Sequence, residues 1–456
     1  MRILSTSSVR GDGGGGSGIF YDPRPLIVGD APFVGVIDFP ATLDRPPVRL
    51  YYPAEESTSS SSSSSSNGNR RLRPARYFSG NRFAHFLLGY AHVAFARHTT
   101  WFHMYFLRPL LWFFSFLAPI RYLKIPYTAH VTDADGARDL NYIPPSSLRM
   151  RMAVSSGDEK KDNGDDEVMQ KQKLVLFSHG LTGTGEENSI FCSSLAKRGY
   201  VVASIHHRDG SSNQVQLHDG SRLYYKHFPS GDAFDPRDRL QQVQIRAKEM
   251  LQCRSWLVDG PEGISDDGDD VEHRRIVLDQ IRPHLKGGGA IAAGFSYGST
   301  TAVLAATLEP NNFCCVLLLD PWLHIDYQSK GVAYDFPPEA FGQCWPQWPP
   351  SEAAETNTLS DTSQTKEGLK IPSLIISSSM FAGFEKLKGA MLRLADQTNS
   401  NADVHVIPDT AHQNFCDVAF WVPKRLLRGF IRLGDANAYD VHEEILDRTV
   451  RFLRRF

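Results

Sequence analysis

Residues 294–298 read Gly-Phe-Ser-Tyr-Gly, and this stretch decides the fold class of the chain. A short apolar run, residues 290–293, precedes it, and residues 299–308 have the pattern of a helix. A strand, a sharp turn and a helix are the context in which a serine between two glycines forms a nucleophile elbow. The glycines let the backbone bend tightly, so that the hydroxyl of Ser296 stands above the edge of a sheet. The alternative is an ordinary turn in which the serine only caps the helix.

The composition is that of a soluble globular protein. The 456 residues are enough for one large α/β domain with insertions or for two domains, and 41% are hydrophobic and 22% charged. A net charge of −2 leaves no excess of basic residues to neutralise phosphates, which argues against a dedicated nucleic-acid binder. The six cysteines have no C-x-x-C pair and no disulfide-like spacing, which is typical of free thiols in a reducing compartment.

Four segments interrupt the globular pattern. Residues 1–26 are predicted to be a flexible amino-terminal segment, without the apolar stretch that a secretory signal needs. Residues 57–69 are a serine tract, residues 155–171 are acidic and polar, and residues 351–368 are rich in Ser, Thr and Glu. Such segments bury too little apolar surface to offset their ordering entropy, so we predict disordered insertions there. One domain is then expected over residues 27–456.

Strands and helices alternate along that domain. The expected strands lie at residues 33–37, 48–52, 173–178, 200–205, 290–293, 313–319, 373–378 and 404–407. The expected helices lie at residues 188–198, 237–258, 271–285, 299–308 and 441–456. This alternation predicts an α/β-hydrolase, with a mostly parallel central sheet and helices on both faces.

The residues for nucleophilic catalysis follow one another in the order that α/β-hydrolases use, which is serine, acid, histidine. A serine hydroxyl attacks only when a base accepts its proton and an acid orients that base. Asp320 ends the apolar run 313–319, beside the elbow, and His412 lies in the loop directly after the last expected strand. The sequence therefore predicts that Ser296, Asp320 and His412 form a catalytic triad.

The residues alone leave the acid open. Many enzymes of this fold carry the acid after the following strand, but no aspartate follows residues 373–378. Asp320 is preferred because it ends a strand next to the elbow. The other carboxylates considered are Glu385, Asp326, Asp409 and Asp417.

Two backbone N–H groups are needed to stabilise an oxyanion. Tyr297, directly after the serine, offers the first. Residues 178–183, Ser-His-Gly-Leu-Thr-Gly, follow an apolar strand and offer the second, with Leu181 as the expected donor. The alternative is that these residues only turn the chain. The loop lacks the lysine and the spacing of a phosphate-binding P-loop.

Several stretches together resemble one family, the platelet-activating factor acetylhydrolases of plasma and intracellular type II. They are VRLYYPAE (48–55), LVLFSHGL (174–181), SLAKRGYVVASIHHRDGSS (194–212), VQIRAKEM (243–250), GFSYGS (294–299), LLLDPW (317–322) and AHQNFCD (411–417). The resemblance spans most of the chain from about residue 27, apart from the insertions. It implies that Ser296 is the nucleophile, Asp320 the acid and His412 the base. It also matches Leu181 and Tyr297 to the oxyanion donors.

The function that the resemblance implies is a calcium-independent serine esterase that hydrolyses the short sn-2 acyl ester of phospholipids. The elbow departs from the usual family pattern G-H-S-F-G-G at Phe295, Tyr297 and Ser299. Two alternatives stay open: a broader carboxylesterase or lipase on the same fold, and a catalytically silent binding protein that keeps it. No histidine cluster has metal-ligand spacing, so no metal or cofactor is predicted.

Residues 101–122 form the most apolar and aromatic stretch of the chain. Its tryptophans and tyrosines favour a membrane interface, and an Arg-Pro pair at 108–109 interrupts it. A buried core helix, a peripheral contact with a lipid surface and a membrane span are the three interpretations. The interruption suits lying in the interface better than crossing the bilayer. We expect a phospholipid substrate, a cytoplasmic protein with peripheral membrane contact, and no nucleic-acid partner.

Overall fold

A computed structural model describes most of the expected domain. The described residues are 26–27, 29–56, 75, 77–78, 82–95, 109–110, 113, 125, 128–130, 140–142, 173–226, 236–260, 269–327, 332–335, 371–397, 402–421 and 433–456. The insertions predicted at 57–69, 155–171 and 351–368 lie outside these residues, as do residues 1–25. Leu26, at the end of the segment predicted to be flexible, is buried, and its carbonyl accepts a hydrogen bond from the hydroxyl of Ser194 at 3.0 Å.

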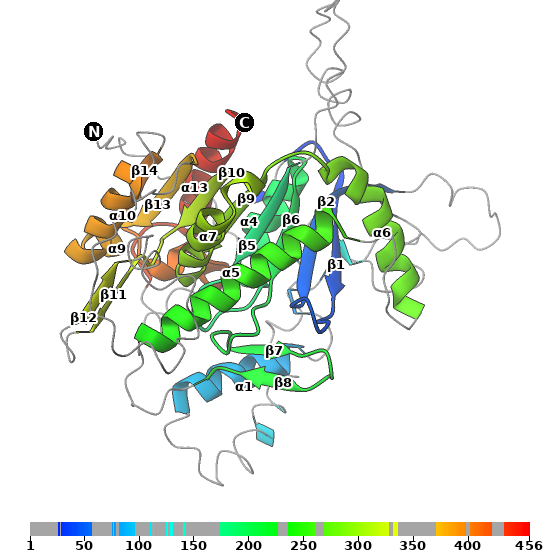
Figure 1. Cartoon of the computed structure of the whole chain (residues 1–456), viewed down its shortest axis with the longest axis horizontal. Coiled ribbons are helices and arrows are strands. Elements are labelled where there is room, and N and C mark those ends of the chain that lie inside the picture. Colours follow the sequence, from blue (N-terminus) through cyan, green and yellow to red (C-terminus); the bar gives the residue numbers. More distant parts are fainter. Residues whose placement is uncertain are drawn as a thin grey trace, which may run out of the picture.

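A ten-stranded sheet forms the centre of the molecule (Figure 1). Its order is β14-β13-β10-β9-β5-β6-β2-β1-β3, with β4 paired to β2. The strands from β14 to β6 are parallel, and β2 runs antiparallel to β6, β1 and β4, so the predicted mostly parallel sheet is confirmed. The strands are β1 (Phe33–Phe39), β2 (Val48–Glu56), β3 (Thr128–His130), β4 (Leu140–Tyr142), β5 (Leu174–Ser178), β6 (Val201–Ile205), β9 (Ala290–Phe295), β10 (Phe313–Leu319), β13 (Ser373–Ser378) and β14 (Ala402–Ile407).

Two antiparallel hairpins and a set of helices complete the described chain. The hairpins are β7 (Gln214–Gln216) with β8 (Arg222–Tyr224) and β11 (His324–Tyr327) with β12 (Val332–Asp335). The α-helices are α1 (Arg82–Phe95), α4 (Ser189–Lys197), α5 (Pro236–Val258), α6 (Asp269–Leu285), α7 (Tyr297–Leu308), α9 (Ser379–Ala382), α10 (Glu385–Gln397), α11 (Val418–Trp421) and α13 (Ala438–Leu453). Short 3₁₀ turns are η6 (Pro310–Asn312) and η8 (His412–Phe415).

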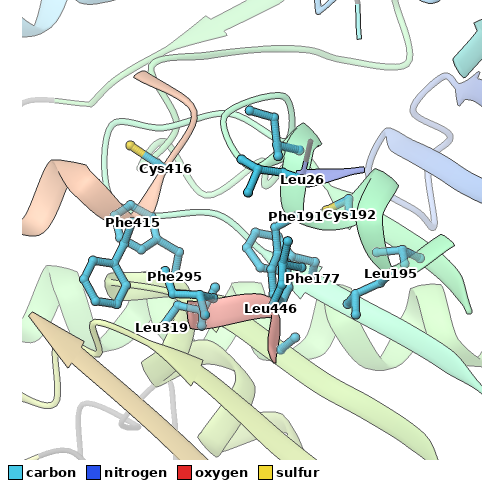
Figure 2. Close-up of a cluster of buried hydrophobic side chains, with 14 of the residues drawn as sticks. Leu26, Phe177, Phe191, Cys192, Leu195, Phe295, Leu319, Phe415, Cys416 and Leu446 are labelled. Carbon is cyan, nitrogen blue, oxygen red and sulfur yellow. The ribbon is translucent and has the colours of Figure 1, made fainter. Parts of the chain in front are cut away.

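Helices cover both faces of the sheet because the central strands are apolar on both sides. In β5, Leu174 and Leu176 pack into one buried cluster, together with α5, α6, α7 and α10. Val175 and Phe177 of the same strand pack into a second cluster, together with α1, α4 and α13. Figure 1 shows α5 and α7 lying across the sheet, and Figure 2 shows part of the second cluster. The sheet is therefore the middle layer of three.

Helix boundaries depend on local capping. Gly199, with φ 97°, follows α4 and ends it where the sequence predicts. The last helix begins at Ala438, three residues before its predicted start, because Asn437 caps it: the Asn437 side chain accepts a hydrogen bond from the N–H of Tyr439.

Candidate active site

Ser296 lies in a sharp turn between β9 and α7. Its φ of 57° and ψ of −119° form a strained conformation that costs a residue with a side chain about 1–3 kcal/mol. The next segment holds this turn, because the Ser296 N–H donates to the Leu319 carbonyl at 2.8 Å and the Ser296 carbonyl accepts from the Trp322 N–H at 3.1 Å. A Cβ atom at Gly294 or Gly298 would overlap backbone atoms, so the close approach requires both glycines.

Asp320 is fully buried at the end of β10, beside the elbow. Its Oδ1 accepts from the Ser378 N–H at 2.7 Å and from the Ser377 hydroxyl at 3.1 Å, and its Oδ2 accepts from the Ser378 hydroxyl at 2.9 Å. The Nδ1 atom of His412 lies 2.7 Å from Oδ2. Because a carboxylate only accepts hydrogen bonds, Nδ1 carries the proton and Nε2 is the basic nitrogen.

His412 begins η8 and is held between two aromatic rings. The ring of Phe381 is parallel to the imidazole, with 4.3 Å between centroids, and the ring of Phe295 lies 4.7 Å away on an almost parallel plane. In the described part of the chain the two phenyl rings make no contact with each other, so we place them on opposite faces of the imidazole. About 18% of the His412 side chain is exposed, which leaves its edge accessible to a substrate.

The three residues predicted as the triad all lie at the carboxyl ends of parallel strands, which meet at one edge of the sheet. Asp320 and His412 are in direct contact. Phe295, which precedes Ser296, stacks on the His412 ring and so brings the elbow next to the base. Within the described residues the Ser296 hydroxyl makes no hydrogen bond to His412. In hydrolases without substrate such a bond often tightens only in the substrate complex.

Alternative acids occupy other places. Glu385 begins α10 with an exposed side chain. Asp409 adopts a φ of 55° in the turn after β14. Asp417 accepts a hydrogen bond from the backbone at the start of α4. Among the described residues, Asp320 is the carboxylate that is hydrogen-bonded to His412.

The segment after the histidine is fastened to the start of α4. Oδ2 of Asp417 accepts from the Ile190 N–H at 3.0 Å, and the Asp417 N–H donates to the Glu187 carbonyl at 2.8 Å. The side-chain amide nitrogen of Asn188 donates to the Phe415 carbonyl at 3.1 Å. These bonds join residues that are 227 positions apart in two cases, so they fix the loop of the base onto a distant part of the chain.

The two predicted oxyanion donors belong to segments next to Ser296. Tyr297 follows it directly, and Leu181 follows Gly180, whose Cα faces the serine: a Cβ atom built at Gly180 would lie 3.3 Å from the Ser296 Cβ. Among the residues that the structure describes, no group accepts a hydrogen bond from the backbone N–H of Leu181 or Tyr297. Both N–H groups can therefore donate to a substrate oxygen.

Each of the three elbow residues that depart from the family pattern contacts another residue. Phe295 supplies one of the rings beside the base. The Tyr297 hydroxyl donates to the carbonyl of Arg239 at 2.5 Å. The Ser299 hydroxyl donates to the carbonyl of Gly294 at 2.8 Å, within the elbow. All three side chains therefore have contacts within the fold.

A buried polar network beneath residues 178–183 was not predicted. The two nitrogens of His207 lie 2.9 Å from Glu249 Oε2 and 2.8 Å from the Ser178 hydroxyl, and Arg208 donates to Glu249 Oε1 at 2.9 Å. Burial lowers the pKa of His207 well below its usual range and raises the pKa of Glu249 to about 7. The signal for this network was present in the runs SIHHRDGSS and VQIRAKEM, which carry these residues.

Two features are absent from the described ranges. No three His, Cys, Asp or Glu side chains there are grouped to hold a metal ion. None of the helices there has the length and apolar character to cross a bilayer. Residues 101–122 lie outside the described residues except for 109–110 and 113.

Part of the chain is similar to one known family. Residues 148–330 match the family model described as platelet-activating factor acetylhydrolase, isoform II. The predicted family resemblance is confirmed over these residues. The matched region contains Leu181, Ser296, Tyr297 and Asp320, and His412 lies beyond it.

Curated relatives carry the name of the platelet-activating factor acetylhydrolase family. The enzyme of Canis lupus familiaris is 31% identical over 168 residues, which is 34% of this chain and 36% of the relative. The enzyme of Cavia porcellus is 29% identical over 163 residues, again 34% of this chain and 36% of the relative. The aligned region thus spans about a third of the length of these relatives.

A solved structure supports the fold. The ferulic acid esterase of Streptomyces cinnamoneus matches with a TM-score of 0.50 at 15% identity, covering 93% of this chain and 90% of that one. At that identity the likeness shows the fold alone, and the α/β-hydrolase fold predicted from the sequence is confirmed.

Proposed function

We propose that this protein is a serine esterase that hydrolyses the short sn-2 acyl ester of phospholipids without calcium. The observation that carries the proposal is the hydrogen bond of 2.7 Å between His412 Nδ1 and Asp320 Oδ2, beside the strained Ser296 elbow. The match of residues 148–330 to the platelet-activating factor acetylhydrolase model supports it. The family and the fold support ester hydrolysis. The acetyl preference rests on the names of the relatives.

In this mechanism His412 Nε2 accepts the proton of the Ser296 hydroxyl as its oxygen attacks the ester carbonyl carbon. The N–H groups of Leu181 and Tyr297 donate to the resulting oxyanion. The imidazolium then protonates the leaving lyso-lipid alkoxide as the acyl-enzyme forms. Water, deprotonated by His412, releases the acid and restores Ser296.

A fluorophosphonate and a substrate panel test the proposal. Wild-type protein and Ser299→Ala should be labelled, and Ser296→Ala should not, because the Ser299 hydroxyl donates to the backbone carbonyls of Gly294 and Leu319 and has no part in the proposed reaction. Ester turnover in Ser296→Ala should fall by about a thousandfold or more while the protein stays folded. Activity should persist in a chelator such as EGTA. Labelling of Ser296→Ala, or a requirement for calcium, would contradict the proposal.

The panel compares acetyl with long-chain sn-2 phospholipids and with simple carboxylic esters. Preference for the long chains or for simple esters would favour a broader carboxylesterase or lipase. An intact fold without labelling or turnover would favour a silent binding protein.

We also propose that residues 101–122 contact the lipid surface from which the substrate is drawn. Of the described residues in this stretch, Leu110 and Phe113 are exposed, by 49% and 57%. Replacement of Trp112 and Phe113 by alanine should slow hydrolysis on liposomes by about tenfold or more and leave a water-soluble ester unaffected. An equal loss on both substrates would place this stretch in the core instead.

A further inference from the structure

Arg246, in the middle of α5, is fully buried beneath the oxyanion loop, residues 178–183. Its Nη1 donates to the His179 carbonyl at 2.7 Å, and its Nη2 approaches the Gly180 carbonyl at 3.4 Å. Its Nε donates to the Ser211 hydroxyl at 2.7 Å and to Asp209 Oδ2 at 3.1 Å. The guanidinium thus has its charge balanced by Asp209 while two of its nitrogens face the loop.

The Gly180 carbonyl has further donors. The Gly183 N–H donates to it at 3.2 Å, and Nδ1 of His179 lies 2.7 Å from it. A carbonyl only accepts, so His179 carries its proton on Nδ1. Burial, with the nearby Arg246 charge, holds the pKa of His179 well below its usual range, and the ring is neutral. Three donors therefore fix the direction of one carbonyl.

That direction also sets the next N–H. In a trans peptide the C=O and N–H groups are rigidly coupled and point in opposite directions. The Gly180 carbonyl faces Arg246 and the interior, so the Leu181 N–H of the same peptide points away from them. Gly180 also lies close to Ser296, because a Cβ atom built on Gly180 would be 3.3 Å from the Ser296 Cβ. In the described part of the chain, no group accepts a hydrogen bond from the Leu181 N–H.

Arg246 also contacts the second donor residue. Its guanidinium carbon lies 4.8 Å from the centre of the Tyr297 ring. A planar guanidinium can hydrogen-bond in its plane and stack on an aromatic ring with its face. One buried side chain therefore contacts both segments from which the oxyanion donors come.

We propose that Arg246 is a positioning residue for the oxyanion hole: it holds the carbonyls of His179 and Gly180 and thereby aims the Leu181 N–H at the reacting oxygen. The inference rests on the proposed function, since it concerns the same ester cleavage. Arg246 touches no substrate atom, and its effect is transmitted through one peptide plane. Arg246 should therefore stabilise the transition state and leave the affinity for the bound substrate unchanged.

The test is Arg246→Lys, which keeps the charge opposite Asp209 but cannot reach both carbonyls and Asp209 at once. Arg239→Lys is the matched control, because Arg239 is also fully buried on α5 and donates to Gln242. Loss of a whole oxyanion donor costs about 10²–10³ in kcat, so a misdirected donor should cost about 10–100-fold. The KM for a soluble acetyl ester should stay within about threefold of the wild-type value in both variants.

Two inhibitors separate positioning from general damage. A trifluoromethyl ketone forms an oxyanion with the serine, and the corresponding secondary alcohol does not. In Arg246→Lys the inhibition constant of the ketone should rise by the same factor as kcat falls, and that of the alcohol should not change. Equal changes for ketone and alcohol, or the same losses in Arg239→Lys, would overturn the inference.

Ser211→Ala provides a second variant if Arg246→Lys does not fold, since it removes one acceptor of the Arg246 Nε and no charge. The ketone should again weaken relative to the alcohol, by about two- to tenfold. An unchanged ratio would overturn the inference. Wild-type protein that is not labelled at Ser296 by a fluorophosphonate would overturn the proposed function itself. Labelling at the same rate in wild-type protein and Arg246→Lys would overturn only the role of Arg246.

Discussion

The ring of Phe381 lies parallel to the imidazole of His412, with 4.3 Å between the ring centroids and 7° between the planes. This stacking restricts rotation of the imidazole about its bond to Cβ, and the hydrogen bond to Asp320 then fixes which edge faces the elbow. A residue 31 positions before the histidine thereby helps to orient the imidazole, which is the proposed base.

Replacement of Phe381 by leucine should therefore reduce turnover without removing any proton-transfer group. An aromatic stacking contact contributes about 0.5–1.5 kcal/mol, so kcat should fall by about two- to tenfold. Phe384→Leu is the control, because Phe384 is exposed and contacts Phe381 from the side. Equal kcat values for the two variants in a soluble-ester assay would show that the stacking does not position the base.

Substitution of Asp320 by asparagine should nearly abolish turnover. The carboxylate accepts from His412 Nδ1–H and from Ser378, and an amide in its place cannot accept with both of its ends. The imidazole would then favour the wrong tautomer, at a cost of about 10⁴ in kcat. Glu385→Gln, at the exposed start of α10, should retain activity in the same assay. The reverse result would identify Glu385 as the acid.

Two glycine substitutions should have opposite effects on stability. A Cβ atom at Gly298 would overlap the backbone carbonyl of Ser178, so Gly298→Ala should lower the free energy of unfolding by about 3 kcal/mol or more. At Gly389, inside α10, the nearest neighbour is the flexible end of Arg393. Gly389→Ala should therefore raise the free energy of unfolding by about 0.5–1 kcal/mol. Urea denaturation of the purified variants measures both values.

Removal of the Glu187 carboxyl should change how stability depends on pH. Burial raises the pKa of Glu187 from 4.5 to about 8, and its Oε1 accepts a hydrogen bond from the Tyr90 hydroxyl. Between these values the folded protein keeps a proton that the unfolded chain has lost. The free energy of unfolding therefore falls as pH rises from about 4.5 to 8, by at most about 1.4 kcal/mol per pH unit from this group.

Glu187→Gln keeps an acceptor for Tyr90 and cannot ionise. The variant should gain stability relative to wild-type protein as pH rises from 5 to 8, and the two should differ least at pH 5. Urea denaturation at unit intervals of pH measures this difference. Parallel curves for the two proteins would mean that Glu187 does not titrate with folding.

The sequence was sufficient to predict the elements that carry the site. Apolar runs marked the central strands, because parallel strands buried on both faces need apolar residues throughout. The positions of Ser296, Asp320 and His412 followed from the chain order and the ends of those strands. The acid could not be settled from the residues alone, because its contact with His412 joins positions 92 residues apart through the order of the sheet.

The supporting residues could not be predicted in the same way. Arg246 lies among the apolar positions of a helix, and a buried arginine is rare unless it is paired. Its partner Asp209 comes from a loop 37 residues earlier, and no local pattern links the two. Phe381 likewise looks like any aromatic residue in a short helix until the fold brings it to the imidazole. Such roles depend on tertiary contacts and leave no periodic signal.

The hydrogen bonds between the segment after His412 and the start of α4 also determine when the site can form during synthesis. A chain made from its amino terminus completes α4 and the elbow long before Phe415 and Asp417 exist. Until then Ser296 has its strained turn and the loop 178–183 beside it, but the proposed proton acceptor is not yet in place. The nascent protein should therefore be inert towards esters through most of its synthesis. The site would become complete in one late step, when the last strand joins the sheet and its loop contacts a helix made 227 residues earlier.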